Sequence, residues 1–393
     1  MKHSIIRRWL LGAPLCAAML CAALGSAWAE ETVKIGFTGP LSGGAALYGK
    51  NVVKGIEMAI NEINAAGLEV AGKKVKLELV ALDDQYSPAE AAINARRLAQ
   101  QSHTPVVFCP HSGGVYALQA INEQENFLLV ASSSSPKIVE MGNKLTVRVS
   151  APFDVWIEPF TRYEMKRFGK RVGMIAGDHD YAKDWARVFQ PVWERAGGTV
   201  VSNNPISYNK SADFYSGVSR VLAEKPDVLF IGGASEPTGL VIKQARELGF
   251  KGGFLIIDQA KLDEVAVVTD GLKPLEGAIS IMLMSLDDRV GPKSFIAAYT
   301  KLYGTEHPPS YEASMNYTIT HAFADAMKLA GTTSDAAAIR AKMNEAVAKL
   351  APERNAVCFS GITAKGSSEY TKLVASVVED GKIKQVPLSD LMK

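Results

Sequence analysis

Short apolar segments of strand type alternate with segments of helical periodicity along most of this 393-residue chain. Residues 33–37 are predicted as a strand. A helix with one buried face follows, with apolar residues at Val52, Ile56, Ile60 and Ile63. A chain that repeats this alternation forms a parallel sheet covered by helices on both faces. The alternation therefore predicts an α/β fold.

The alternation comes in two sets. Further strands are predicted at 75–82, 106–108 and 128–131, then at 172–176, 228–231 and 254–257. Residues 87–90, Ser-Pro-Ala-Glu, have the pattern of a helix start. Later helices are predicted at 185–195, 214–223, 238–248, 317–329 and 336–350. No low-complexity linker separates the sets, so we expect two similar lobes joined by several short crossovers. The predicted lobes are 30–149 with about 280–357, and 150–279 with about 358–393.

The first 29 residues have the pattern of an export signal. Three basic residues precede an apolar run over roughly 9–24, and residues 27–29 read Ala-Trp-Ala. This order predicts a signal peptide cleaved after Ala29 and a soluble periplasmic protein. A membrane anchor is the first alternative, although the run is short and contains Gly12 and Pro14. A lipoprotein signal is the second, although Cys16 and Cys21 each follow a leucine where a small residue is expected.

The predicted mature chain has a nearly balanced charge. Without the three basic residues of the signal it keeps 40 basic against 41 acidic residues, a net charge of −1. This balance gives no attraction to nucleic acid or to an anionic membrane. Cys109 and Cys358 remain, and both a disulfide and two separate thiols fit the sequence. No CxxC, HxxxH or HExxH spacing occurs, so neither a metal nor a cofactor is expected.

The loops after the predicted strands carry the candidate binding residues, because ligands of open parallel sheets bind beyond the carboxyl ends of the strands. Hydroxyl groups and helix-start N–H groups suit a ligand carboxylate. Asp258 suits an ammonium group, and two tyrosines can flank an apolar portion. In chain order the candidates are Tyr48, Ser112, Ser132, Ser133, Ser134, Tyr181, Ala234 and Asp258.

Each of these signals also has a purely structural interpretation. The serine run 132–135 fits a turn with a helix cap, and Asp258 fits a helix cap as well. His111 beside Ser112 suggests a base and a nucleophile, but neighbouring loop side chains seldom face each other. No GxSxG or GxGxxG motif is present, so we do not expect an enzyme. Trp185, at helical spacing with two other aromatic residues, is assigned to the core.

A set of short segments recurs in a characteristic order along the chain. The segments are 33–36 (VKIG), 39–43 (GPLSG), 48–49 (YG), 55–64 (GIEMAINEIN), 82–85 (LDDQ), the Ser112 loop, 132–136 (SSSSP), 227–233 (DVLFIGG) and 244–249 (QARELG). Together they resemble the leucine/isoleucine/valine-binding proteins of bacterial ABC transporters. The similarity covers nearly the whole predicted mature chain, and it rests on the order of the segments rather than on one motif.

The resemblance implies two Rossmann-like lobes with parallel sheets, three crossovers and a ligand clamped between the lobes. Carried over position by position, Ser112 and Ser134 hold the ligand carboxylate, and Ser132 offers its carbonyl to the amine. Asp258 stands where the family places an acidic residue for that amine. In a register shifted by one, Ser133 takes the place of a neighbouring serine.

Tyr48 and Tyr181 match tyrosines that line the family's site, whereas Ala234 replaces an aromatic residue. This replacement predicts a different, larger side-chain pocket. The resemblance implies a periplasmic, monomeric protein that delivers a carboxylate-bearing ligand, an amino acid of the branched-chain or a related type, to the permease of an ABC importer. The alternative is an amide, a urea, or an aromatic or aliphatic acid on the same fold. A hydrolase would need a poised nucleophile or a metal site, and we find neither in the sequence. A DNA-binding regulator of this architecture would need an N-terminal pair of DNA-binding helices and no signal peptide, so the sequence argues against it.

Overall fold

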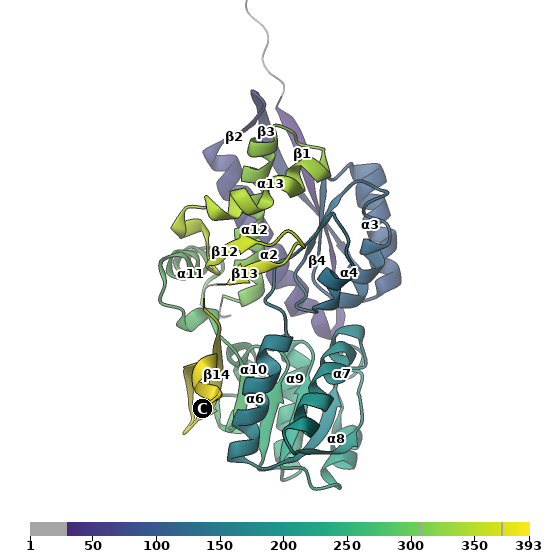
Figure 1. The fold of residues 1–393 in the computed structure, drawn as a ribbon, viewed down its shortest axis with the longest axis vertical. Coiled ribbons are helices and arrows are strands. Elements are labelled where there is room, and N and C mark those ends of the chain that lie inside the picture. Colours follow the sequence, from purple (N-terminus) through teal and green to yellow (C-terminus); the bar gives the residue numbers. More distant parts are fainter. Residues whose placement is uncertain (1–29, 306–308, 371) are drawn as a thin grey trace, which may run out of the picture.

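The computed structural model describes residues 30–305, 309–370 and 372–393, so the predicted signal peptide lies outside the described residues. The chain forms two α/β lobes, one above the other along the long axis in Figure 1. Each lobe is built on its own sheet, and in each sheet most neighbouring strands are parallel. The predicted fold class is confirmed.

The first lobe contains a six-stranded sheet of order β2-β3-β1-β4-β5-β6. Its strands are β1 (Glu31–Gly39), β2 (Leu68–Val70), β3 (Lys73–Asp83), β4 (Val106–Cys109), β5 (Leu128–Ala131) and β6 (Thr146–Arg148). All neighbours pair in parallel except β2 with β3. Its helices are α2 (Ala46–Ala66), α3 (Pro88–Ser102), α4 (Ser112–Gln119), α5 (Lys137–Glu140), α11 (Val290–Tyr303), α12 (Tyr311–Ala330) and α13 (Ala336–Ala348).

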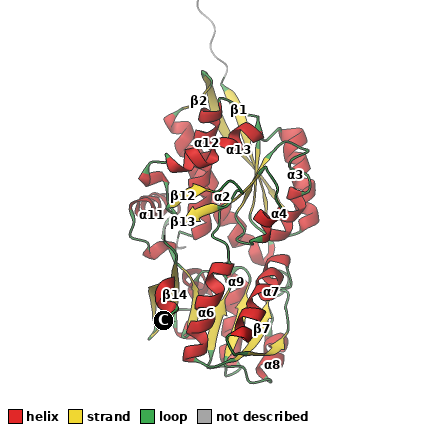
Figure 2. Cartoon of the chain, in the orientation of Figure 1, coloured by secondary structure: helices red, strands yellow, loops and turns green. Residues whose placement is uncertain are grey.

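The second lobe contains a seven-stranded sheet of order β15-β14-β11-β10-β9-β7-β8. Its strands are β7 (Arg171–Ala176), β8 (Thr199–Asn203), β9 (Val228–Gly232), β10 (Gly253–Ile256), β11 (Ala278–Ile281), β14 (Val374–Glu379) and β15 (Lys382–Pro387). Strands β14 and β15 are antiparallel and form one edge. Its helices are α6 (Asp154–Arg167), α7 (Asp180–Arg195), α8 (Tyr215–Leu222), α9 (Ser235–Glu247), α10 (Leu262–Val268) and α14 (Leu388–Leu391); Figure 2 shows them around the sheet.

Local sequence accounts for where the helices begin. Helix α3 starts at Pro88, and the Ser87 hydroxyl accepts the Glu90 N–H at 3.4 Å, as the predicted helix start requires. Helix α12 is apolar or small on nearly every face and is buried along most of its length, because it packs against both α2 and α13. Among the described residues, no helix combines the length and the apolar character that a membrane span needs.

The chain passes between the lobes three times: after β6, after β11, and between β13 (Ser368–Tyr370) and β14. The division differs from the sequence prediction at the last passage. Strand β12 (Phe359–Ile362) was expected in the second lobe, but Phe359 and Ile362 are buried in the core of the first lobe, where β12 packs against α13. Only the segment from β14 onward joins the second sheet. Cys109 and Cys358 are separate thiols.

Candidate functional site

A cavity lies between the two lobes, with about 620 Å³ of space that atoms do not fill, part of it open to solvent. Loops at the carboxyl ends of strands in both sheets and the three crossovers surround it. Its lining includes six of the eight predicted residues, Tyr48, Ser132, Ser133, Ser134, Tyr181 and Asp258. The location of these six residues after the carboxyl ends of parallel strands therefore correctly predicted that they lie around one cavity.

The serine run after β5 forms the wall on the side of the first lobe. The Ser132 carbonyl accepts a hydrogen bond from the Ser150 hydroxyl, and the Ser132 hydroxyl donates to Asn316 Oδ1 at 2.9 Å. The Ser134 hydroxyl lies 2.7 Å from the Tyr181 hydroxyl, which belongs to the second lobe. Each of these serine hydroxyls has a protein partner, so its orientation in the cavity wall is fixed.

Two predicted residues do not reach the cavity. Ser112 is the first residue of α4 and is fully buried, with its hydroxyl 2.7 Å from the Ser133 hydroxyl, so it supports Ser133 from behind. Ala234 is buried at the N-cap of α9, where its carbonyl accepts a hydrogen bond from Thr238. The structure therefore does not bring Ala234 to the place where a side-chain pocket was expected.

Asp258 follows β10 and forms part of the wall on the side of the second lobe. Its Oδ1 accepts a hydrogen bond from Trp185 Nε1 at 3.0 Å, and the same N–H lies 3.0 Å from the Tyr181 hydroxyl. Burial raises the pKa of Asp258 to about 6, although Ser134 and Lys261 act in the opposite direction. Trp185 is in the core as predicted, and in addition it orients Asp258.

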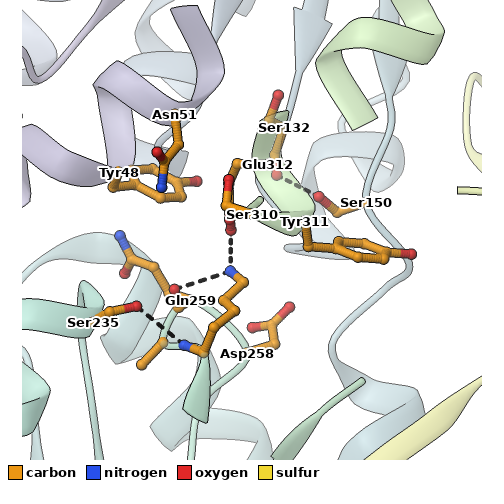
Figure 3. Close-up of polar contacts among 12 residues, drawn as sticks. Tyr48, Asn51, Ser132, Ser150, Ser235, Asp258, Gln259, Ser310, Tyr311 and Glu312 are labelled. Atoms are coloured by element: carbon orange, nitrogen blue, oxygen red, sulfur yellow. Dashed lines mark hydrogen bonds and ion pairs between the residues drawn. The ribbon is translucent and has the colours of Figure 1, made fainter. Parts of the chain in front are cut away.

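An ion pair inside the cavity was not predicted. Lys261 Nζ contacts the Glu312 carboxylate and also donates to the Gln259 carbonyl at 3.0 Å, and Figure 3 marks both contacts. Lys261 lies three residues after Asp258, so its position in the strand-end loop was a usable signal. Glu312 lies in the first turn of α12, far along the chain, and no local pattern relates it to the other lining residues.

His111 lines the cavity without forming a catalytic pair. The Gly114 N–H donates to His111 Nδ1 at 3.1 Å, so Nε2 carries the proton that faces Asp84 Oδ2 at 2.9 Å. Ser112 instead contacts Ser133, so the two neighbours are not a base and a nucleophile. Asp84, Cys109 and His111 lie close enough to hold a metal. However, both imidazole nitrogens already have partners, and burial raises the pKa of the Cys109 thiol.

The end of the cavity next to the crossovers is lined mainly by apolar residues, although Ser150 and Lys372 also lie on these crossovers. Trp156 and Tyr311 supply aromatic rings, and Met282 and Met315 supply flexible side chains. The remaining apolar lining residues are Pro110, Ala151, Ile281, Leu373 and Val374. The cavity therefore suits a ligand with a charged or polar head and an apolar body.

Further contacts hold the lobes together outside the cavity. Tyr116 in α4 donates to Asp184 in α7 at 2.5 Å. Asn51 in α2 donates to Glu264 in α10 at 2.9 Å, and the Ser235 hydroxyl donates to the other oxygen of Glu264 at 2.5 Å. Burial and the nearby Glu312 raise the pKa of Glu264 to about 8. The Tyr116–Asp184 and Asn51–Glu264 contacts join the two lobes, as expected for a closed arrangement, whereas the Ser235–Glu264 contact lies within the second lobe.

Comparison with known proteins identifies the family. A family model described as periplasmic binding protein matches residues 32–357. The chain belongs to this periplasmic binding protein family. The predicted resemblance is therefore confirmed at the level of the family.

Individual members of the family are distant relatives. The Leu/Ile/Val-binding protein BraC3 of Rhizobium johnstonii is 30% identical over 240 residues, which is 61% of this chain and 63% of that protein. The Leu/Ile/Val-binding protein of Escherichia coli is 25% identical over 246 residues, which is 62% of this chain and 66% of that protein. The chain thus matches just under two thirds of the length of these two relatives.

Solved structures share the fold. The branched-chain amino acid binding protein LivJ of Streptococcus pneumoniae, in complex with isoleucine, has a TM-score of 0.75 at 22% identity, and the match covers 91% of this chain and 99% of that one. A solute-binding protein of R. palustris in complex with benzoate has a TM-score of 0.75 at 18% identity, covering 91% of this chain and 96% of that one. At these identities the likeness concerns the fold alone.

Proposed function

We propose that this protein is a solute-binding protein that captures an amino acid between its lobes and delivers it to an ABC importer. The observation that carries the proposal is the cavity itself, where serine hydroxyls of one lobe face the buried carboxylate of Asp258 on the other. Hydroxyl groups donate to a ligand carboxylate, and Asp258 accepts from its ammonium. The relatives named as Leu/Ile/Val-binding proteins support the same class of ligand.

In the proposed pose the ligand lies between the two lobes. Its carboxylate meets Ser133 and Ser134, its amine meets Asp258, and its side chain points to the apolar end beside Trp156 and Met315. The Ser132 carbonyl, already bonded to Ser150, has a second lone pair for the amine. Ser112 acts through Ser133 in this pose rather than by touching the ligand.

The remaining parts of the proposal concern the cell. The protein is exported by the signal at residues 1–29, works in the periplasm as a monomer, and meets the permease subunits of the importer. It carries out no chemical reaction. N-terminal sequencing of periplasmic extract should find a chain that begins at Glu30. An intact Met1 or an acylated Cys21 would contradict this part of the proposal.

The decisive experiment is mass spectrometry of the ligand released from purified protein, followed by a thermal-shift screen of amino acids and carboxylic acids. We expect an amino acid among the released compounds and a raised melting temperature with the same compound. An acid without an amine as the preferred ligand would replace this proposal with the alternative ligand class. No stabilisation by any compound of either class would refute the proposed amino-acid ligand.

A further inference from the structure

The ion pair of Lys261 and Glu312 joins the two lobes within the cavity. Lys261 precedes α10 in the second lobe, whereas Glu312 belongs to the first turn of α12 in the first lobe. Their side chains are only 4% and 5% exposed, and both residues line the cavity. Figure 3 shows Glu312 and Asp258 on facing sides of this region. Two carboxylates from different lobes therefore flank one ammonium group.

Carboxyl groups outnumber cations at this place. Asp258, Glu264 and Glu312 surround Lys261, and Glu312 raises the pKa of both other carboxyls while Lys261 lowers it. Lys372 also lines the cavity but is exposed to solvent. Near neutral pH Glu264 is mostly protonated, because its pKa is about 8, but one buried lysine still cannot neutralise both Asp258 and Glu312. A ligand that brings a positive charge therefore reduces the repulsion, whereas an anion alone increases it.

One buried hydrogen-bond acceptor near the pair has no donor among the described residues. The Gln259 amide donates through Nε2 to the Tyr86 hydroxyl at 3.0 Å, but its Oε1 is buried and has no partner among the described residues. The Asp258 carboxylate accepts from the Trp185 N–H at Oδ1 and also has a hydrogen bond from Ser134, so it is partly satisfied but still carries its charge. A ligand ammonium brings three N–H donors to this group of acceptors.

We propose that Glu312 acts together with Asp258 as a specificity-determining residue for the ligand's amine, which lies between the two carboxylates and shares Glu312 with Lys261. This inference rests on the proposed function, since it requires an amino-acid ligand. An amine held by both residues ties the first lobe to the second, so it stabilises closure as well as binding. An acid of the same shape without an amine brings no such link. The site therefore selects amino acids over their deaminated analogues.

The test compares matched ligand pairs on matched variants by isothermal titration calorimetry. The pairs are leucine with 4-methylpentanoate, and phenylalanine with 3-phenylpropanoate, because the apolar end contains aromatic rings. The variants are Glu312→Gln, the double variant Lys261→Met with Glu312→Gln, and Glu353→Gln, which makes the same change at an exposed position of the first lobe. The double variant removes both charges together, so it carries the test if the single variant leaves Lys261 unpaired and unfolds.

We expect wild type and Glu353→Gln to prefer the amino acid of each pair. Glu312→Gln should lower amino-acid affinity about tenfold or more and leave the deaminated acid unchanged or tighter, and the double variant should lose the preference as well. If the variants bind the amino acid as wild type does, or weaken both ligands of a pair equally, the role of Glu312 is overturned while the proposed function stands. If wild type binds no amino acid in these pairs or in the screen, both fail.

Discussion

The two lobes share one α/β architecture but meet the cavity with different chemistry. The first lobe offers mainly hydroxyl groups, from Ser132 to Ser134 and from Ser150, with one carboxylate at Glu312, whereas the second offers charged groups at Asp258 and Lys261. The difference lies in the loops after the strands, since the sheets beneath them are alike in plan. A zwitterion held between two such walls has a preferred direction, with its carboxylate toward the serine hydroxyls and its amine toward Asp258 and the nearby Glu312.

A substitution in the charged wall of the second lobe should cause the largest loss of ligand affinity. Asp258→Asn keeps an acceptor for Trp185 but removes the charge that faces the ligand amine. We expect amino-acid affinity to fall about 100-fold, since losing one partner of a buried charge pair costs roughly 2–5 kcal/mol. Titration calorimetry with an amino acid and its deaminated analogue measures the effect. Equal losses for both ligands would mean that Asp258 is structural.

The hydroxyl wall should give a smaller effect. Ser134→Ala removes a hydroxyl that lines the cavity, and we expect affinity to fall roughly tenfold or more, because a hydrogen bond to a charged group contributes about 1.5–3 kcal/mol. Ser112→Ala is the matched comparison, because Ser112 acts through Ser133 and should cost less. A larger loss for Ser112→Ala would restore Ser112 as a direct ligand contact.

A contact away from the cavity separates closure from recognition. Tyr116→Phe removes the hydrogen bond to Asp184 that links the lobes, and Tyr116 does not line the cavity. We expect affinity for every ligand to fall about fivefold, since one partly exposed hydrogen bond contributes about 1 kcal/mol. A titration series across several ligands should show one common factor. A change that depends on the ligand would place Tyr116 in recognition.

The smallest effect near neutral pH should come from Glu264. Its pKa is raised to about 8 in the folded protein, above the ordinary value of 4.5, so the folded state holds this proton more tightly. Its contribution to stability is complete below about pH 4.5 and is lost as the pH rises through about 8. We expect Glu264→Gln to raise the melting temperature relative to wild type at pH 9, with little change at pH 6. Thermal unfolding at both pH values measures this, and a variant less stable than wild type at pH 9 would contradict it.

The sequence predicts the secondary-structure elements better than it predicts the full set of residues that line the cavity. The strands that carry the site are apolar and are flanked by small residues, so their ends and the loops after them could be located by pattern. Strands β6 (Thr-Val-Arg) and β8 (Thr-Val-Val-Ser-Asn) were missed, because neither contains the run of three or more apolar residues that located the equally short β4 and β5. The final crossover was misplaced because the pattern of β12 and β13 does not say which lobe buries Phe359.

For the residues that line the cavity, too, local pattern predicts the positions that directly follow strands but not the positions set by tertiary packing. Asp258 and the serine run follow strands directly, and strand ends of one parallel sheet converge. Glu312 reaches the cavity only because α12 packs along α2, a tertiary fact without a local signal. Trp185 shows the reverse case, since helical spacing correctly assigned it to the core but could not show that its indole N–H points at Asp258.

The crossovers that line the apolar end of the cavity have a consequence for transport. Ala151, Met282 and Leu373 belong to or adjoin the connections about which the lobes would turn. The apolar body of a ligand that is too long would therefore press against the hinge and keep the lobes partly open, even while its polar head is well bound. The angle between the lobes in the bound state would then increase with the length of the ligand. A permease that recognises only the closed conformation would not transport such a ligand. The longest ligands would therefore bind tightly and yet not be taken up.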